Sequence, residues 1–363
     1  WILVWRLLKI IFYYIMDKAY YKTLQPLIDS GHLEAAINGI YKFPDGVNLF
    51  PGISCMFDCA FCGRDRDTKL SNYNYFYDTL LDQDPKDNLK RYNISGGLEP
   101  LTYNEIDRLA KDLVDRGFIS RLVTNGYLLT KKNLQKKPNL LRLHHIRVSL
   151  YGYSRPQTLL TTRHEKGYDV VKQNLTDYNK LNDKPPLHIN HVILPTDFEN
   201  LNNILNYIDD IGGVDTLSLR EDFSFKYPIS DRQRLMDKLL DFNEKINTRS
   251  MKVDYGYALE GLLEGKEVEL LKVNYKQLTK TQSPQVRIAI DPKGDIYSYF
   301  EAAFVGRKNS ERHILGNVIN SSIQDELKNL KKIQPEENDI EFFDAFNHVI
   351  EGYKWMKLQE TNQ

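Results

Sequence analysis

All three cysteines of this 363-residue chain fall within eight residues, at Cys55, Cys59 and Cys62. Three cysteines are too few for a disulfide framework, and an odd number leaves one thiol without a partner. A C-x3-C-x2-C loop can instead bring three thiolates to three irons of a four-iron cluster, which leaves the fourth iron without a protein ligand. Structural zinc normally takes four ligands, so a zinc site would need a distant side chain such as His144. We therefore expect an iron–sulfur cluster, with a zinc site or unligated thiols as the alternatives.

The charge balance excludes several kinds of partner. Lys and Arg together number 49, and so do Asp and Glu, so the formal net charge is zero. No overall field attracts nucleic acid or an anionic membrane, and we expect neither as a partner. Trp1–Met16 is mostly apolar, but Arg6 and Lys9 interrupt it, and it is shorter than the roughly 20 residues that span a bilayer. We expect a packed helix here, or an interfacial one, with no membrane span and no cleavable signal, and hence a cytoplasmic protein.

Short apolar segments alternate with amphipathic ones between residues 46 and 225. This order predicts parallel strands joined by right-handed helical crossovers. An incomplete barrel and an open sheet would both show this pattern. The six predicted strands are Val47–Phe50, Arg91–Ser95, Arg121–Thr124, His145–Leu150, His188–Leu194 and Thr216–Leu219. The clearest helices between them are Tyr103–Arg116 and Asn200–Ile211.

The segments on either side of this region have a different pattern. Tyr20–Ile40 is predicted to be helical, and Pro228–Thr248 to be a long charged amphipathic helix. Gln285–Phe300 is predicted to form a hairpin around the turn Asp291–Asp295, packed against the mouth of the barrel, with a helical tail from Ser322. We therefore divide the chain into an N-terminal helical segment (1–45), a partial barrel (46–225) and a C-terminal α+β extension (226–363).

A second motif, Ser95-Gly96-Gly97-Leu98-Glu99-Pro100, follows the second predicted strand. The two glycines let a ligand approach the backbone closely, and a nearby backbone carbonyl could accept a hydrogen bond from an ammonium group. A tight turn alone would favour the same residues. Together with the cysteine loop one strand earlier, however, the motif resembles the radical S-adenosylmethionine (radical SAM) superfamily.

The resemblance implies an α/β fold with a partial (β/α)6 barrel of the TIM type, flanked by N-terminal helices and a C-terminal α+β extension. It implies that Cys55, Cys59 and Cys62 ligate a [4Fe-4S] cluster whose open iron binds SAM. An electron from the cluster then cleaves SAM to a 5′-deoxyadenosyl radical, which removes a hydrogen atom from the substrate. We expect the electron to come from an external donor of the flavodoxin or ferredoxin type, or from a partner reductase.

Two predicted strands alternate polar and apolar residues, unlike ordinary parallel strands that are buried on both faces. Residues 145–151 place Arg147 and Ser149 on one face, and residues 216–220 likewise group Ser218 and Arg220. The apolar faces should meet the helices, so the polar faces should line the lumen, where a polar ligand or water must satisfy them. A solvated open edge is the alternative.

Residues near predicted strand ends are candidates for binding SAM. The family more often has Gly-Gly-Glu-Pro, so Leu98 is an insertion before Glu99, and Glu99 can also start a helix. Asn125 could face the cofactor or cap the next helix. The resemblance places Ser149 near the ribose or the methionyl carboxylate and Val192 near adenine. The full candidate set is Gly96, Gly97, Glu99, Asn125, Ser149, Val192 and Arg220, of which Arg220 could pair with a carboxylate.

Three strings are further similar to radical SAM enzymes that modify sugars in aminoglycoside and nucleoside antibiotic pathways, such as a paromamine 3′-deoxygenase and a cytosylglucuronic acid decarboxylase. The strings are Cys55–Arg64, Gly96–Thr102 and Glu301–Gly316. The similarity implies a lyase or dehydratase that abstracts hydrogen from a carbohydrate-type small molecule, which then loses water. Decarboxylation of a uronate, or modification or activation of a peptide or protein, are the alternatives. The extension lacks further cysteines, so no auxiliary cluster is expected.

Expulsion of a ring substituent needs an acid near the leaving group and a base near the remaining hydroxyl. Glu301, Glu221 and His188 are our candidates for these catalytic roles, because they are titratable groups near predicted strand ends. An amino sugar would favour carboxylates such as Glu221, Asp222 and Glu301. A uronate would instead need a cation, for which Arg147, Arg163 or Arg220 would serve. For Glu301, a plain surface charge on the hairpin is the alternative.

Overall fold

The computed structural model describes residues 18–38, 40–65, 69–85, 91–221, 229–264, 286–332 and 336. The predicted helix at Trp1–Met16, the candidate Asp222 and the helical tail beyond residue 332 lie outside these ranges. In the part of the chain that is described, no helix is both long enough and apolar enough to cross a membrane.

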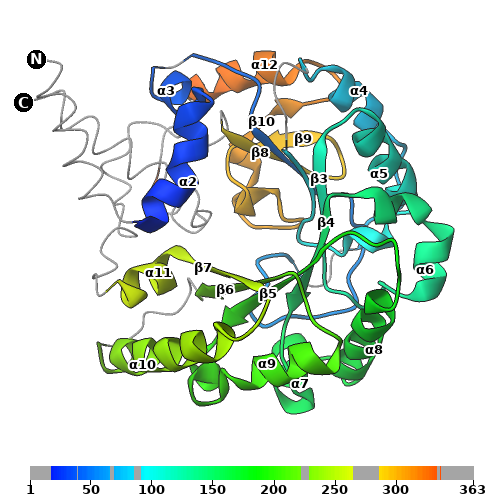
Figure 1. Ribbon diagram of the computed structural model, residues 1–363. Coiled ribbons are helices and arrows are strands. Elements are labelled where there is room, and N and C mark those ends of the chain that lie inside the picture. Colours follow the sequence, from blue (N-terminus) through cyan, green and yellow to red (C-terminus); the bar gives the residue numbers. More distant parts are fainter. Residues whose placement is uncertain are drawn as a thin grey trace, which may run out of the picture.

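One mixed sheet of ten strands forms the centre of the molecule, in the order β10-β9-β8-β1-β2-β3-β4-β5-β6-β7 (Figure 1). All six predicted strands are present and pair in parallel, which confirms the α/β partial barrel. They are β1 (Gly46–Leu49), β2 (Arg91–Ile94), β3 (Ile119–Thr124), β4 (His145–Leu150), β5 (Leu187–Ile193) and β6 (Thr216–Glu221). A seventh strand that we did not predict, β7 (Lys252–Tyr255), pairs in parallel with β6.

Helices follow the strands and cover the outer face of the curved sheet (Figure 1). They are α4 (Tyr77–Asp82), α5 (Ile106–Asp115), α6 (Lys131–Lys136), α7 (Arg155–Thr162), α8 (Gly167–Asn179), α9 (Asn203–Asp210) and α10 (Ile229–Ile246). The predicted helix Tyr103–Arg116 begins later than expected, because Tyr103 ends a 3-10 turn, η1 (Pro100–Thr102). Leu109 and Leu113 of α5 are fully buried, as expected for the apolar face of a helix packed on a sheet.

Within residues 18–38, two helices precede the sheet, on the side opposite α5 to α8 (Figure 1). The predicted helical stretch Tyr20–Ile40 is split into α2 (Lys18–Asp29) and α3 (His32–Ile37). The break falls at Gly31, whose φ of +69° is a left-handed conformation that ends a helix. Helix α2 contacts α11 (Tyr257–Leu263), which follows the edge strand β7, so α2 lies near that edge of the sheet.

The C-terminal hairpin is present, but its position differs from our expectation. Strands β8 (Arg287–Ile290) and β9 (Asp295–Tyr297) are antiparallel, and the Asp291 carboxylate accepts hydrogen bonds from the backbone N–H groups of Lys293 (2.8 Å) and Asp295 (3.0 Å) across the turn. We expected this hairpin to be packed against the mouth of the barrel. Instead β8 pairs in parallel with β1, so the hairpin extends the sheet.

Three short elements complete the described C-terminal region. Strand β10 (Ile314–Asn317) is antiparallel to β9, and α12 (Ile323–Glu326) and the 3-10 helix η9 (Leu327–Lys332) follow it. One sheet therefore runs across the expected boundary near residue 225, and the division at 45 and 225 stays a prediction.

The strand registers define the inner face of the sheet. Val123, Ser149, Asn190 and Val192 line one cavity, and residues two positions away on the same strands share their face. On β4 the alternate residues Ile146 and Val148 are fully buried on the helix side. The polar side of β4 therefore faces the lumen, as we predicted.

Candidate active site

A cavity of about 370 Å³ lies at the carboxyl ends of the parallel strands, where open α/β sheets commonly bind ligands. Ten predicted site residues line it together: Cys55, Cys59, Cys62, Gly96, Gly97, Glu99, Asn125, Ser149, Val192 and Glu301. The loops after β1, β2 and β3 contribute most of them, and Glu301 comes from the C-terminal region. The fold thus brings residues that are distant in the sequence to one cavity.

The cysteine loop is held in place by backbone hydrogen bonds to the end of α7. The N–H groups of Asp58 and Ala60 donate to the carbonyl oxygens of Thr162 (3.0 Å) and Thr161 (2.9 Å). Within the loop, the Arg64 guanidinium donates to the Phe57 carbonyl oxygen at 2.8 Å. These bonds fix the backbone that carries the three thiols without using the thiols themselves.

The thiols fit an iron–sulfur cluster better than a single metal ion. Burial raises the pKa of Cys59, and the charges of Cys62 and Cys55 raise it further, so the thiolate form needs the positive charge of bound metal. Structural zinc normally takes four protein ligands, whereas a cluster with one open iron takes one thiolate on each of three irons. Three thiols in one loop therefore match the cluster.

The glycine motif serves both packing and approach to the cavity. Gly96 has a φ of +122°, and a Cβ there would lie 2.7 Å from the Phe50 ring, so the turn and its packing both require glycine. Gly97 lines the cavity, and a Cβ there would lie 3.2 Å from the Phe304 ring. The tight-turn interpretation therefore explains Gly96, and the close-approach interpretation suits Gly97.

Glu99 joins the loops that follow β2 and β3. Its Oε1 accepts hydrogen bonds from Thr124 Oγ1 (2.7 Å) and Leu101 N (3.1 Å), and its Oε2 accepts one from Asn125 N (2.9 Å). Burial raises the pKa of Glu99, and these three bonds oppose that effect. The bond to Leu101 also caps the 3-10 turn η1, so the expected helix-start role of Glu99 is confirmed.

Asn125 faces the cysteine loop. Its side-chain amide donates to Met56 Sδ at 3.0 Å and lies 3.6 Å from Cys55 Sγ. The next helix, α6, is capped instead by Thr130, whose hydroxyl accepts a hydrogen bond from Asn133 N at 3.1 Å. Of the two interpretations of Asn125, the structure therefore favours the one that turns it toward the cavity.

Glu301 reaches the cavity from η7 (Glu301–Ala303), which follows β9. Arg307 lies 3.9 Å from its carboxylate and donates to the Gly63 carbonyl oxygen at 3.1 Å. The Asp65 N–H donates to the Val305 carbonyl oxygen at 3.1 Å. This segment is thus docked on the cysteine loop, and Glu301 is a cavity residue rather than a charge on an outer surface.

Three other candidates, Arg220, His188 and Glu221, are not among the described residues that line this cavity. Arg220 forms an ion pair with Asp254 on β7. His188 stacks on His145, with ring centroids 4.2 Å apart. The Glu221 carboxylate packs against Gly256, where a Cβ would lie 1.7 Å from its Oε2.

His191 faces the helices, as expected for a structural histidine. It is 2% exposed, with Nδ1 at 2.9 Å from the Leu150 carbonyl oxygen.

Sequence reasoning missed several residues of the cavity wall. Phe57, Phe61, Arg64 and Phe304 all line it. The ring of Phe61 lies 5.7 Å from that of Tyr151, centroid to centroid, and Phe57 contacts Tyr151 edge-on at 6.0 Å. The position of Phe61 between two predicted metal ligands was a usable signal, whereas the approach of Phe304 depends on the pairing of β8 with β1.

The chain is similar to proteins of known function and to solved structures. No protein-family model matches the chain. It is 32% identical over 359 residues to dTDP-4-amino-4,6-dideoxy-D-glucose ammonia-lyase of Streptomyces venezuelae, covering 92% of this chain and 74% of that protein. The fold of this chain is similar to that of Streptococcus suis SuiB bound to S-adenosylmethionine (TM-score 0.57, 18% identity, covering 84% of this chain and 68% of that chain). It is also similar to anSMEcpe with bound AdoMet (TM-score 0.54, 14% identity, 82% and 83%).

The chain belongs to the radical SAM superfamily. It is a radical SAM enzyme of the lyase type, and its predicted cofactors, a [4Fe-4S] cluster and SAM, are confirmed by this membership. Cys55, Cys59 and Cys62 are the thiols that would hold the cluster. When bound, the cluster and SAM supply the radical that abstracts hydrogen, while the protein binds, orients and excludes water.

Proposed function

We propose that this protein is a radical SAM lyase that removes ammonia from an amino-deoxy sugar carried on a nucleoside diphosphate. The observation that carries the proposal is the 32% identity, over 92% of the chain, to an ammonia-lyase named for such a substrate. The proposal replaces the loss of water that we expected from the sequence with loss of ammonia, since the leaving group is an amine instead of a hydroxyl. The cavity is consistent with this substrate because it places the carboxylate of Glu301 near the three thiols.

The proposed reaction balances as an internal redox elimination. Hydrogen-atom abstraction from a ring carbon that bears a hydroxyl leaves a radical there, and the hydroxyl gives up its proton. The C–N bond to the neighbouring carbon then breaks, and the amine leaves as ammonia. Return of one hydrogen atom, or of one electron and one proton, completes a ketone beside a new CH2 group. The substrate carbon that bears oxygen is oxidised, and the carbon that bore nitrogen is reduced.

Residues of the chain would supply the proton transfers and the enclosure. Glu301 is the carboxylate best placed to pair with the substrate ammonium and to take or return a proton, with Arg307 holding it at 3.9 Å. The rings of Phe57, Phe61 and Tyr151 pack together at the cavity wall and would keep water from the radical. SAM would lie along Gly97, Asn125 and Ser149, which line the same cavity.

Two further parts of the proposal concern the cell. The cluster needs an external one-electron donor of the flavodoxin or ferredoxin type, or a partner reductase, because each radical starts with one electron. Three free cysteines favour a reducing compartment, so we place the enzyme in the cytoplasm.

The test is turnover by anaerobically reconstituted enzyme. Protein with its cluster is mixed with SAM, dithionite and dTDP-4-amino-4,6-dideoxy-D-glucose, and ammonia, 5′-deoxyadenosine and the sugar product are measured. We expect the wild type to release ammonia and a keto sugar in equal amounts. We expect Glu301→Gln to release both much more slowly. The matched control is Glu311→Gln, a surface change on the same C-terminal region. Loss of water from the 4-hydroxy analogue, with no ammonia from the amino sugar, would overturn the proposed leaving group.

A further inference from the structure

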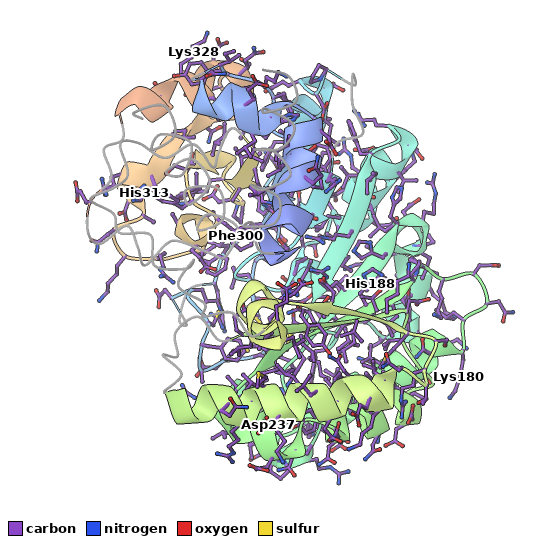
Figure 2. All side chains as sticks on the ribbon, turned by 60° about the vertical axis from the view of Figure 1, so that its left-hand side comes forward. Lys180, His188, Asp237, Phe300, His313 and Lys328 are labelled. Atoms are coloured by element: carbon purple, nitrogen blue, oxygen red, sulfur yellow. The ribbon has the colours of Figure 1, made fainter. Side chains whose placement is uncertain are left out.

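A layer of cationic side chains lies directly beneath the cavity, toward the amino ends of the strands. Arg121 and Arg147 come two residues before Val123 and Ser149, which line the cavity, so all four share the inner face. Two residues of strand correspond to about 7 Å. His188 pairs in register with Arg147 and lies among the strands, as Figure 2 shows.

The charges in this layer have the same sign. The groups whose charges act most strongly on Arg121 are four other arginines: Arg147, Arg287, Arg220 and Arg91. Burial and this repulsion hold the pKa of Arg121 well below its usual range and lower the pKa of Arg147 to about 10. Asp254, the carboxylate that acts on Arg147, is already paired with Arg220.

Several nitrogens of the layer also lack partners within the described part of the chain. The Nε atoms of Arg121 and Arg147, Nε2 of His145 and Nδ1 of His188 are buried without a hydrogen bond. Buried polar groups are normally satisfied, and leaving charged ones unsatisfied costs free energy. Converging guanidinium groups are the usual protein partner of phosphate, because each presents N–H donors in a planar fork.

We propose that Arg121, Arg147 and His188 bind the diphosphate of a nucleoside-diphosphate sugar whose sugar ring occupies the cavity above them. The inference rests on the proposed function and deepens it, since it assigns the anionic part of the substrate to a site of its own. The distance between the cavity and the layer suits such a substrate. Its first phosphate is joined to the sugar by a single oxygen, and the arginines lie about two strand residues, or about 7 Å, below the residues that line the cavity. The substrate is thus held with its sugar toward the thiols and its nucleotide toward the amino ends of the strands.

The same layer has another possible explanation, in which the arginines only fill the lumen and are screened by water. The two explanations differ in what happens when a phosphate is offered. A structural layer would not bind dTDP, whereas an anion site would bind it with an affinity that falls as salt is added.

The experiment measures dTDP binding to the enzyme carrying its cluster and SAM, by titration calorimetry, for the wild type, Arg147→Gln and Arg121→Gln. We expect each substitution to weaken dTDP binding by about 10- to 100-fold, as for loss of a hydrogen bond to a charged group. Inorganic pyrophosphate should compete with dTDP. Arg155→Gln, on the surface and paired with Asp169, is the matched control and should bind dTDP as the wild type does.

Each outcome decides the inference. Weak binding that is equal in the wild type and both variants would overturn it, even if the ammonia-lyase reaction proceeds. Tight, arginine-dependent dTDP binding without ammonia release would support it while refuting the proposed reaction. Should either variant fold poorly, the other variant and the salt dependence of wild-type binding supply the readout, because a filler layer predicts no dTDP affinity at any salt concentration.

Discussion

At the carboxyl ends of β2 and β3, Glu99 accepts three hydrogen bonds and holds two loops together. About two residues deeper, the Nε atoms of Arg121 and Arg147 are buried and have no hydrogen-bond partner among the residues that the structure describes. The upper layer, made by the loops that carry the thiols, Glu99 and Asn125, is complete before a ligand arrives. The lower layer, made by Arg121, Arg147, His145 and His188, places Arg121 and Arg147 among other arginines whose like charges repel them. The upper layer is therefore preorganised. The lower layer lowers the stability of the free protein, and in our proposal the same uncompensated charges raise its affinity for an anion.

Removing a sulfur from the upper layer gives the largest expected effect. Cys59→Ala deletes one of the three thiols that would hold the cluster, so release of 5′-deoxyadenosine from SAM should fall to background. Anaerobic iron loading followed by chromatographic assay measures this. The binding of dTDP by the lower layer should change less than about twofold, since no arginine is altered. Undiminished release of 5′-deoxyadenosine would contradict the ligand assignment.

Glu99→Gln tests whether the upper layer is as rigid as its bonds suggest. Glutamine keeps one acceptor oxygen but turns an N–H group toward the Asn125 N–H, so we expect the free energy of unfolding to fall by about 2–3 kcal/mol. Urea denaturation measures the change. The control Glu105→Gln, an exposed residue without a capping bond, should change stability by less than about 0.5 kcal/mol. Equal effects in the two variants would mean that Glu99 does not hold the loops.

His145 tests the cost of the lower layer through pH. Burial, helped by the charges of His188, Arg121, Arg147 and His144, lowers the pKa of His145 to about 3. The folded state therefore binds fewer protons than the unfolded state between pH 6.5 and 3, and stability is lost as the pH falls through this window.

His145→Phe removes this titration and keeps a ring against His188. The variant should lose about 2 kcal/mol less than the wild type between pH 6.5 and 4, allowing for solvent screening in the lumen. Urea midpoints across this range measure the difference, and dTDP should reduce the loss in the wild type. Parallel pH profiles for the two proteins would show that the layer is not strained by charge.

Arg163→Gly should have the smallest effect. Arg163 follows α7 with a φ of +55°, which glycine adopts without strain, and its ion pair with Asp58 joins two half-exposed side chains. Relief of strain and loss of the pair should nearly cancel, for a net change within about 1 kcal/mol. Iron content should be unchanged, because backbone bonds hold the cysteine loop. A loss of iron on loading would show that the ion pair positions the loop.

Local patterns predicted much of this fold. The strands from β1 to β6 were recognisable because each is a short run, either apolar or alternating polar and apolar, between turns. The turn at Asp291 was recognisable because its side chain can accept a hydrogen bond from the backbone ahead of it. Strand β7 is only four residues long and half-exposed, so its pattern is weak. The pairing of β8 with β1 joins segments far apart in sequence, and no local pattern encodes it.

For the site, too, local motifs were predictable from the sequence and long-range placements were not. The thiols and Gly97 lie in local motifs, and the structure brings them together with Glu301. Arg121 lay within a predicted strand, but its meaning depends on which arginines the neighbouring strands place beside it. Glu221 and His188 were chosen as strand-end groups, but neither lines the cavity, because His188 lies at the amino end of β5, below Asn190, and Glu221 alternates to the other face of β6 from Arg220.

The pairing of β1 with β8 has a consequence for synthesis. Strand β1, which leads into the cysteine loop, remains an open edge until a partner about 240 residues later leaves the ribosome. At about 5–20 residues per second, that interval is roughly 12–48 s. The edge of β1 beside the cysteine loop thus stays unpaired during this interval, and because unpaired strand edges aggregate, we expect chaperones to raise the yield of folded enzyme.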